Sequence, residues 1–159
     1  MKNLFKMLSF SVFVLFLISC SDDYGDKPAD GPTVTTFNAT LLGSNEVPSN
    51  NSTATGAATL TFNNSTKIFT IAVTHNVATT TMGHIHMGLP TANGGVVFGF
   101  PNFASPIAYT SVALTTAQEA DLNANMYYVN IHSTAFPGGE VRGQLLKGAT
   151  TRLGRGSGY

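Results

Sequence analysis

Short runs rich in threonine, valine, isoleucine and phenylalanine follow one another from Thr33 onward, and they limit the fold more than any other feature. Glycine, asparagine and proline interrupt these runs every few residues, which leaves room for strands but not for a long helix. In the clearest run, residues 68–76, large apolar residues alternate with small or polar ones. His75 shares the apolar face of that run and is expected at the edge of the core. The pattern predicts an all-β domain, a sandwich or barrel of seven to eight strands.

One segment is expected to be helical. Residues 114–122 read LTTAQEADL, a composition that suits a short helix better than a strand. Thr115 is followed three residues later by Gln118, and Thr116 by Glu119, so two registers offer a capping box. The sequence therefore predicts one short helix among the strands.

A hairpin is expected near the end of the folded part, because residues 127–132 and 140–146 flank a loop rich in proline and glycine. Alternation gives each strand one polar face. These faces comprise Tyr128, Asn130 and His132 on the first strand and Glu140, Arg142 and Gln144 on the second. If the strands pair in register, Glu140 and Arg142 can join one charge-assisted network, in which Arg142 pairs with Glu140 or with a neighbouring acceptor. That network either orients His132 in a functional site or only sets the strand register.

The N-terminus resembles an export signal. Lys2 and Lys6 precede an almost entirely apolar stretch, residues 8–18, which is too short to span a membrane as a helix. The stretch ends in the tetrapeptide LISC, which resembles a lipobox. We expect a signal peptide at residues 1–19, cleavage before Cys20, and a lipid on Cys20 that anchors the exported protein in the outer membrane.

The rest of the chain divides into three parts. Residues 20–32 are acidic and contain proline and glycine, which predicts a flexible tether. The tripeptide Ser21-Asp22-Asp23 at its start resembles a surface-export signal, so the domain is expected to face the cell surface; a plain acidic linker is the alternative. Residues 33–147 form the β domain, and the glycine-rich residues 148–159 are expected to be a flexible tail.

Composition argues against several classes of protein. Cys20 is the only cysteine, so no disulfide is possible. Once Lys2 and Lys6 are removed with the signal, six basic and eight acidic residues remain, a formal charge of −2. A protein with this net charge lacks the excess of basic residues that is typical of nucleic-acid-binding proteins. The sequence also lacks a glycine-rich phosphate loop, a nucleophile elbow and a carboxylate pair spaced for glycoside hydrolysis.

Histidines make up the candidate site. His84 and His86 share one face of an expected strand, about 7 Å apart along it, and His132 ends another expected strand. A His-x-His pair with a third histidine from a second strand is a common copper or zinc site. The only soft donors besides Cys20 that accompany them are Met82 and Met87, so the site is nitrogen-rich. The alternative is that the three imidazoles form hydrogen bonds in a polar seam of the sandwich.

Several phrases of the sequence together resemble the CHRD (chordin-type) domain family, in the family's order over about residues 33–147. They are FNATL (37–41) with NEVP (45–48), GAA (56–58), HIHMG (84–88), NGGVV (93–97), LTTAQ (114–118), YVNIHS (128–133) and PGGEVRGQL (137–145). Ser133 stands where the family usually has threonine. The resemblance implies an immunoglobulin-like β-sandwich. In animals the family occurs in extracellular proteins that bind growth factors, and in bacteria mostly in exported proteins.

The implied fold and the His-x-His strand are also loosely similar to copper/zinc superoxide dismutase. In that family a His-x-His pair and a later histidine bind copper, with an arginine nearby. By this resemblance His84, His86 and His132 would bind the metal, and Arg142 would lie beside them. The sequence shows no counterpart of the bridging histidine or of the zinc loop.

Three hypotheses for function follow. The first is a membrane-anchored exported lipoprotein whose domain is a non-enzymatic binding module for an extracellular protein or glycan, which the few charges and threonine-rich strands favour. The second is a copper- or zinc-binding protein that uses His84, His86 and His132. The third is a redox enzyme at that metal.

Overall fold

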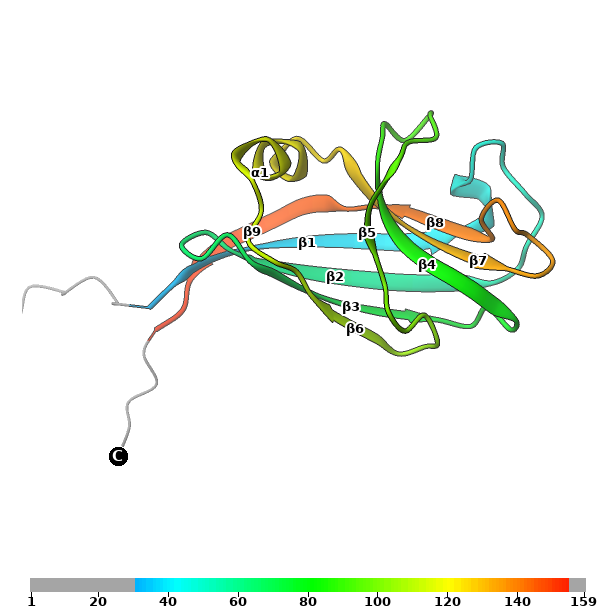
Figure 1. The fold of residues 1–159 in the computed structure, drawn as a ribbon, viewed down its shortest axis with the longest axis horizontal. Helices are drawn as coiled ribbons and strands as arrows, with labels where there is room; N and C mark the ends of the chain where they lie inside the picture. Colours follow the sequence, from blue (N-terminus) through cyan, green and yellow to red (C-terminus); the bar gives the residue numbers. More distant parts are fainter. Residues whose placement is uncertain (1–30, 155–159) are drawn as a thin grey trace, which may run out of the picture.

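The computed structural model describes residues 31–154, and all elements named here lie within that range. Nine strands, one 3-10 turn and one α-helix follow one another along the chain (Figure 1). Their bounds are β1 Thr33–Leu42, η1 Gly43–Asn45, β2 Thr55–Asn63, β3 Phe69–His75, β4 Thr80–Met87, β5 Val96–Gly99, β6 Ile107–Thr110, α1 Thr116–Asn123, β7 Tyr127–Ser133, β8 Val141–Gln144 and β9 Leu146–Arg152.

The strands form one curled antiparallel sheet in the order β5-β4-β7-β8-β1-β2-β3-β6, and β9 pairs with β1. Its two halves join where Leu42 of β1 pairs with Arg142 of β8. The curl packs one half on the other: Phe98 of β5 meets Phe69 of β3 edge to face, with ring centroids 5.2 Å apart. The all-β sandwich with one short helix is therefore confirmed. The described residues contain nine strands, one more than the expected seven to eight.

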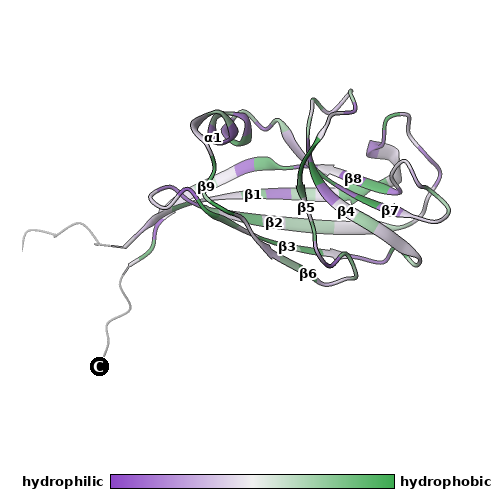
Figure 2. Cartoon of the chain, viewed as in Figure 1, coloured by the Kyte–Doolittle hydropathy of each residue, from purple (hydrophilic) through white to green (hydrophobic). Residues whose placement is uncertain are grey.

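Alternation along β1, β2 and β3 separates the core from the outer faces. Phe69, Ile71 and Val73 of β3 are buried, whereas Thr70 and Ala72 between them are exposed. The inward side chains of both halves merge into one apolar cluster. In Figure 2 the strands carry both hydrophobic and hydrophilic stretches, and α1 and the region of η1 also carry hydrophilic ones. The strand pattern therefore leaves the polar faces on the outside of the sandwich.

The helix α1 starts two residues later than the expected segment 114–122, because Thr115 caps it. The Thr115 side chain accepts a hydrogen bond from the Gln118 amide, and the Gln118 side chain accepts one from the Thr115 amide. Leu122 anchors the helix in the core. Of the two registers that the sequence offered, the structure contains the one that uses Thr115 and Gln118.

The folded part of the chain continues past the expected boundary at Lys147. Residues 148–152, which were expected to begin a flexible tail, belong to β9 instead, and Arg152 pairs with Thr33 at the start of β1. This part of β1 has β2 on only one side, so its other edge offers free backbone groups that β9 satisfies.

The expected signal peptide, Cys20 and nearly all of the expected tether lie outside the described residues, as do residues 155–159. Within residues 31–154, no helix has the length and apolar character needed to cross a membrane.

Candidate metal centre

Strands β4 and β7 bring the three predicted histidines together. They pair so that His84 lies opposite Asn130 and His86 opposite Tyr128, which puts His132 one pair further along the same face. One ring nitrogen from each histidine lies within 4.8 Å of the others. The closest of these contacts joins His84 Nδ1 and His132 Nε2 at 3.3 Å. Two nitrogens bound to one tetrahedral zinc ion are also about 3.3 Å apart, given bonds of about 2.0–2.1 Å.

Backbone carbonyl groups determine which ring nitrogen of His86 and of His132 carries the proton and which has a free lone pair. His132 Nδ1 lies 3.0 Å from the Pro137 carbonyl oxygen, and His86 Nδ1 lies 3.0 Å from the Gly94 carbonyl oxygen. A carbonyl oxygen only accepts, so each Nδ1 carries the proton and each Nε2 presents a lone pair. In the described part of the chain His86 Nε2 is buried and has no hydrogen-bond partner. Buried polar atoms usually have a partner, so this nitrogen, which lies beside two other imidazoles, is available to a ligand.

The surroundings of the site favour neutral imidazoles. Burial lowers the pKa of His84, and the neighbouring His132 and His86 lower it further. Burial also lowers the pKa of His86, against the opposing effect of its bond to Gly94. A histidine must be neutral to bind a metal ion through its lone pair. The lowered pKa values therefore favour the neutral form of His84 and His86, which is the form that binds a metal ion.

A stack of three side chains supports His86. Its ring lies parallel to that of Tyr128, with 5.0 Å between centroids and 7° between planes. The guanidinium carbon of Arg142 lies 3.5 Å from the Tyr128 ring centroid. Strands β4 and β8 flank β7, so Tyr128 is held between His86 and Arg142.

The loop that joins β4 to β5, residues 88–95, folds over this polar face. Arg142 donates to the Leu89 and Ala92 carbonyls at 2.7 and 3.0 Å and to Asn93 Oδ1 at 3.2 Å. The Gly94 amide donates to the Tyr128 hydroxyl oxygen at 3.0 Å. The loop is thereby fastened where it presents the Gly94 carbonyl to His86.

The hairpin of β7 and β8 is confirmed, with Asn130 opposite Arg142. The expected contact between Glu140 and Arg142 is wrong, because no bond joins them in the described chain. Glu140 ends the preceding loop, where its carboxylate accepts from Ser52 Oγ at 2.8 Å, and the β4–β5 loop supplies the acceptors of Arg142. The Gln144 amide nitrogen donates to the carbonyls of Gly88 and Asn125.

Glu46 also belongs to this network, although no sequence pattern predicted a role for it. It is buried at 7% exposure, and the Asn130 amide approaches its carboxylate at 3.5 Å. Burial raises its pKa to about 7, although Arg142 and Asn130 act in the opposite direction. The only sequence signal was its place in the phrase NEVP.

His75 lies apart from the cluster, as expected. It is half-buried at the end of β3, and its Nε2 lies 3.0 Å from the Phe103 carbonyl oxygen.

The fold and the cluster define the class: an all-β sandwich whose outer sheet face carries three convergent histidines beneath a fastened loop. A family model of the CHRD domain matches residues 37–145, and the chain belongs to this family. The match runs from β1 to the end of β8 and includes every residue of the histidine cluster and of the polar network around it. Searches of curated proteins and of solved structures found no significant match.

Proposed function

We propose that this protein is an exported, lipid-anchored domain that binds a copper or zinc ion through His84, His86 and His132. The observation that carries the proposal is the buried Nε2 of His86, which presents a lone pair without a partner beside two other imidazoles. The site supplies three nitrogen ligands and leaves further positions to other donors.

The polar-seam alternative accounts for only part of the cluster. In a purely structural seam His84 Nδ1 donates to His132 Nε2 across 3.3 Å, which satisfies those two atoms. His86 Nε2 has no place in that arrangement. A bound ion would take the place of the proton between His84 Nδ1 and His132 Nε2. It would then accept the lone pairs of His84 Nδ1, His86 Nε2 and His132 Nε2.

Calorimetric titration of the purified full chain with Cu²⁺ and Zn²⁺ at neutral pH tests the proposal. We expect saturable binding at micromolar metal that is lost in His84→Ala, His86→Ala and His132→Ala. His75→Ala is the matched control and should bind as the wild type does, because His75 lies outside the cluster. Absence of binding, or binding that survives the loss of both His84 and His132, would favour the polar seam.

The lipid anchor on Cys20 and the surface location are proposals that rest on the sequence. The lipobox-like LISC and the single cysteine support the anchor, and Asp22-Asp23 directly after it support exposure at the cell surface.

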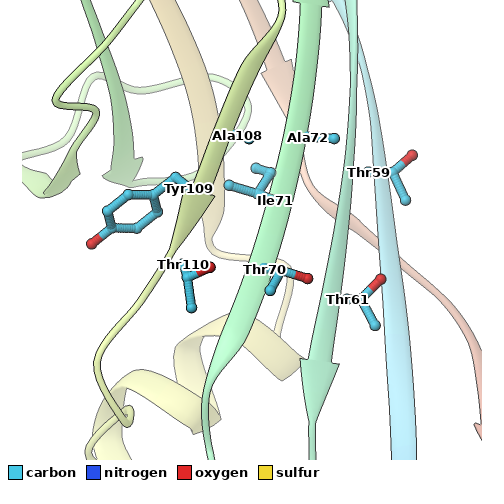
Figure 3. Close-up of a pocket in the computed structure, with 8 residues that line it drawn as sticks. All are labelled: Thr59, Thr61, Thr70, Ile71, Ala72, Ala108, Tyr109 and Thr110. Carbon is cyan, nitrogen blue, oxygen red and sulfur yellow. The ribbon is translucent and has the colours of Figure 1, made fainter.

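A second binding face lies on the other half of the sandwich, and we propose it as a site for an extracellular protein or glycan. Thr36, Thr61, Thr70 and Thr110 lie opposite one another in a row across β1, β2, β3 and β6. A pocket of about 430 Å³ opens beside the row, and its lining contains no charged side chain (Figure 3). A row of hydroxyl groups on a face without charged side chains suits an uncharged sugar surface.

A glycan array tests the glycan ligand. Signals from the wild type that disappear with Thr70→Lys would support this face, whereas equal signals from both proteins would place the binding elsewhere.

A further inference from the structure

We infer that the histidine cluster takes copper(I), with the thioether of Met82 as its fourth ligand. The inference rests on the proposed metal site and names the ion and the missing donor.

Strand β4 contains two methionines of nearly equal exposure, Met82 at 43% and Met87 at 42%. Met82 precedes His84 by two residues, so alternation places it on the face of the histidines. Met87 directly follows His86 and falls on the opposite face. Alternation therefore favours Met82 over Met87, and the register against β7 adds that Met82 lies opposite a histidine of the cluster.

The pairing of β4 with β7 determines the distance between Met82 and the histidine cluster. Met82 lies directly opposite His132. Directly opposed residues of an antiparallel pair have Cβ atoms about 4.5–5.5 Å apart. Methionine has a flexible, unbranched side chain, so its sulfur can reach an ion held by the neighbouring imidazoles. Met82 is 43% exposed, so its side chain is only partly held by packing.

The donor set matches a soft, singly charged ion. The cluster contains three imidazoles and no carboxylate, so no ligand charge offsets a dication. The Arg142 guanidinium on the far side of Tyr128 adds positive charge near His86. Thioether and imidazole ligands suit copper(I), whereas carboxylate ligands suit harder dications. These features together favour copper(I) over zinc.

Anaerobic titration of the purified full chain with copper(I), in competition with a chromophoric copper(I) chelator, tests the inference. Zinc affinity is measured in parallel by calorimetry. Met82→Leu should weaken copper(I) binding by about tenfold or more, the scale on which even outer partners change metal affinity, and should leave zinc affinity within about twofold. Met87→Leu is the control with matched exposure and should change neither. X-ray absorption of the copper(I) form should show a sulfur neighbour that Met82→Leu removes.

The outcomes separate the inference from the proposed function. Equal copper(I) affinity of Met82→Leu and wild type, together with loss of binding in His84→Ala, would overturn the methionine ligand and keep the metal site. Failure of the wild type to bind either copper or zinc would overturn both.

Discussion

Arg142 is only 1% exposed although its guanidinium is permanently charged. The fold accommodates this charge because three acceptors of the β4–β5 loop and the ring of Tyr128 surround it. The same loop presents the Gly94 carbonyl to His86. A side chain of β8 therefore holds a histidine of β4 in place through a loop and a tyrosine.

Arg142→Ala should destabilise the protein by on the order of 3 kcal/mol, because it removes a buried charge and leaves the loop acceptors unpaired. Arg152→Ala, in the exposed strand β9, should change stability by less than about 0.5 kcal/mol. Urea unfolding of the two variants measures the difference. Equal unfolding midpoints would mean that Arg142 contributes no more than a surface charge.

Glu46 should make stability depend on pH. Its pKa is raised in the folded state from 4.5 to about 7, so its contribution is fully present below about pH 4.5 and is lost as the pH rises through about 7. Across that window the wild type should lose on the order of 3 kcal/mol relative to Glu46→Gln, whose side chain stays neutral. The difference between their urea-unfolding free energies isolates Glu46, because the other titrating groups cancel. A difference that is constant with pH would contradict the raised pKa.

At the scale of elements, the pairing register of a strand decides which of its side chains face the core, because a shift by one residue moves every side chain to the other face. β4 shows an irregular register between Thr80 and Met82 against β7, and between Ile85 and His86 against β5. The pairing with β7 is regular from Met82 to Met87, so His84 and His86 keep a spacing of two on that side. The start of helix α1 is likewise fixed by one residue, the N-cap Thr115.

Thr115→Ala should reduce the free energy of unfolding by about 1 kcal/mol, since it removes the acceptor for the Gln118 amide. Thr116→Ala is the matched control, because Thr116 would be the cap only in the alternative register. Thermal unfolding followed by circular dichroism compares the two. If Thr116→Ala were the more damaging change, the capping box would be misassigned.

At the scale of the whole molecule, both ends of the described chain lie at one end of the sandwich, where Thr33 pairs with Arg152 (Figure 1). The loop after η1 and the β7–β8 loop lie at the opposite end in Figure 1.

Cys20→Ala should give an unlipidated chain that no longer sediments with membranes, whereas the wild type should sediment even after a high-salt wash. The expectation follows from the lipobox-like LISC and the single cysteine. Added protease should also cleave the wild-type domain on intact cells, and Asp22→Ala with Asp23→Ala should protect it. Sedimentation of Cys20→Ala with membranes would show that the anchor lies elsewhere.

The amino-acid sequence alone determined what depends on neighbouring residues. Alternation and turn residues indicated an all-β sandwich. A spacing of two residues placed His84 and His86 on one strand face. The LTTAQ segment predicted a capped helix. All three are local signals, because each arises from backbone geometry over a few residues. The CHRD resemblance added His132 to the same framework, since its phrases follow one order along the chain.

Only the tertiary structure decided the features that join distant segments. Residues 148–152 resemble a tail in composition, yet they complete the edge of β1, with Thr35 and Thr150 bonded across 115 residues of sequence. Arg142 finds its acceptors in a loop about 50 residues earlier rather than in Glu140. Met82 comes to lie opposite His132 only through the pairing of β4 with β7. Such choices depend on how the sheet curls and which loops cover it, and no local pattern encodes them.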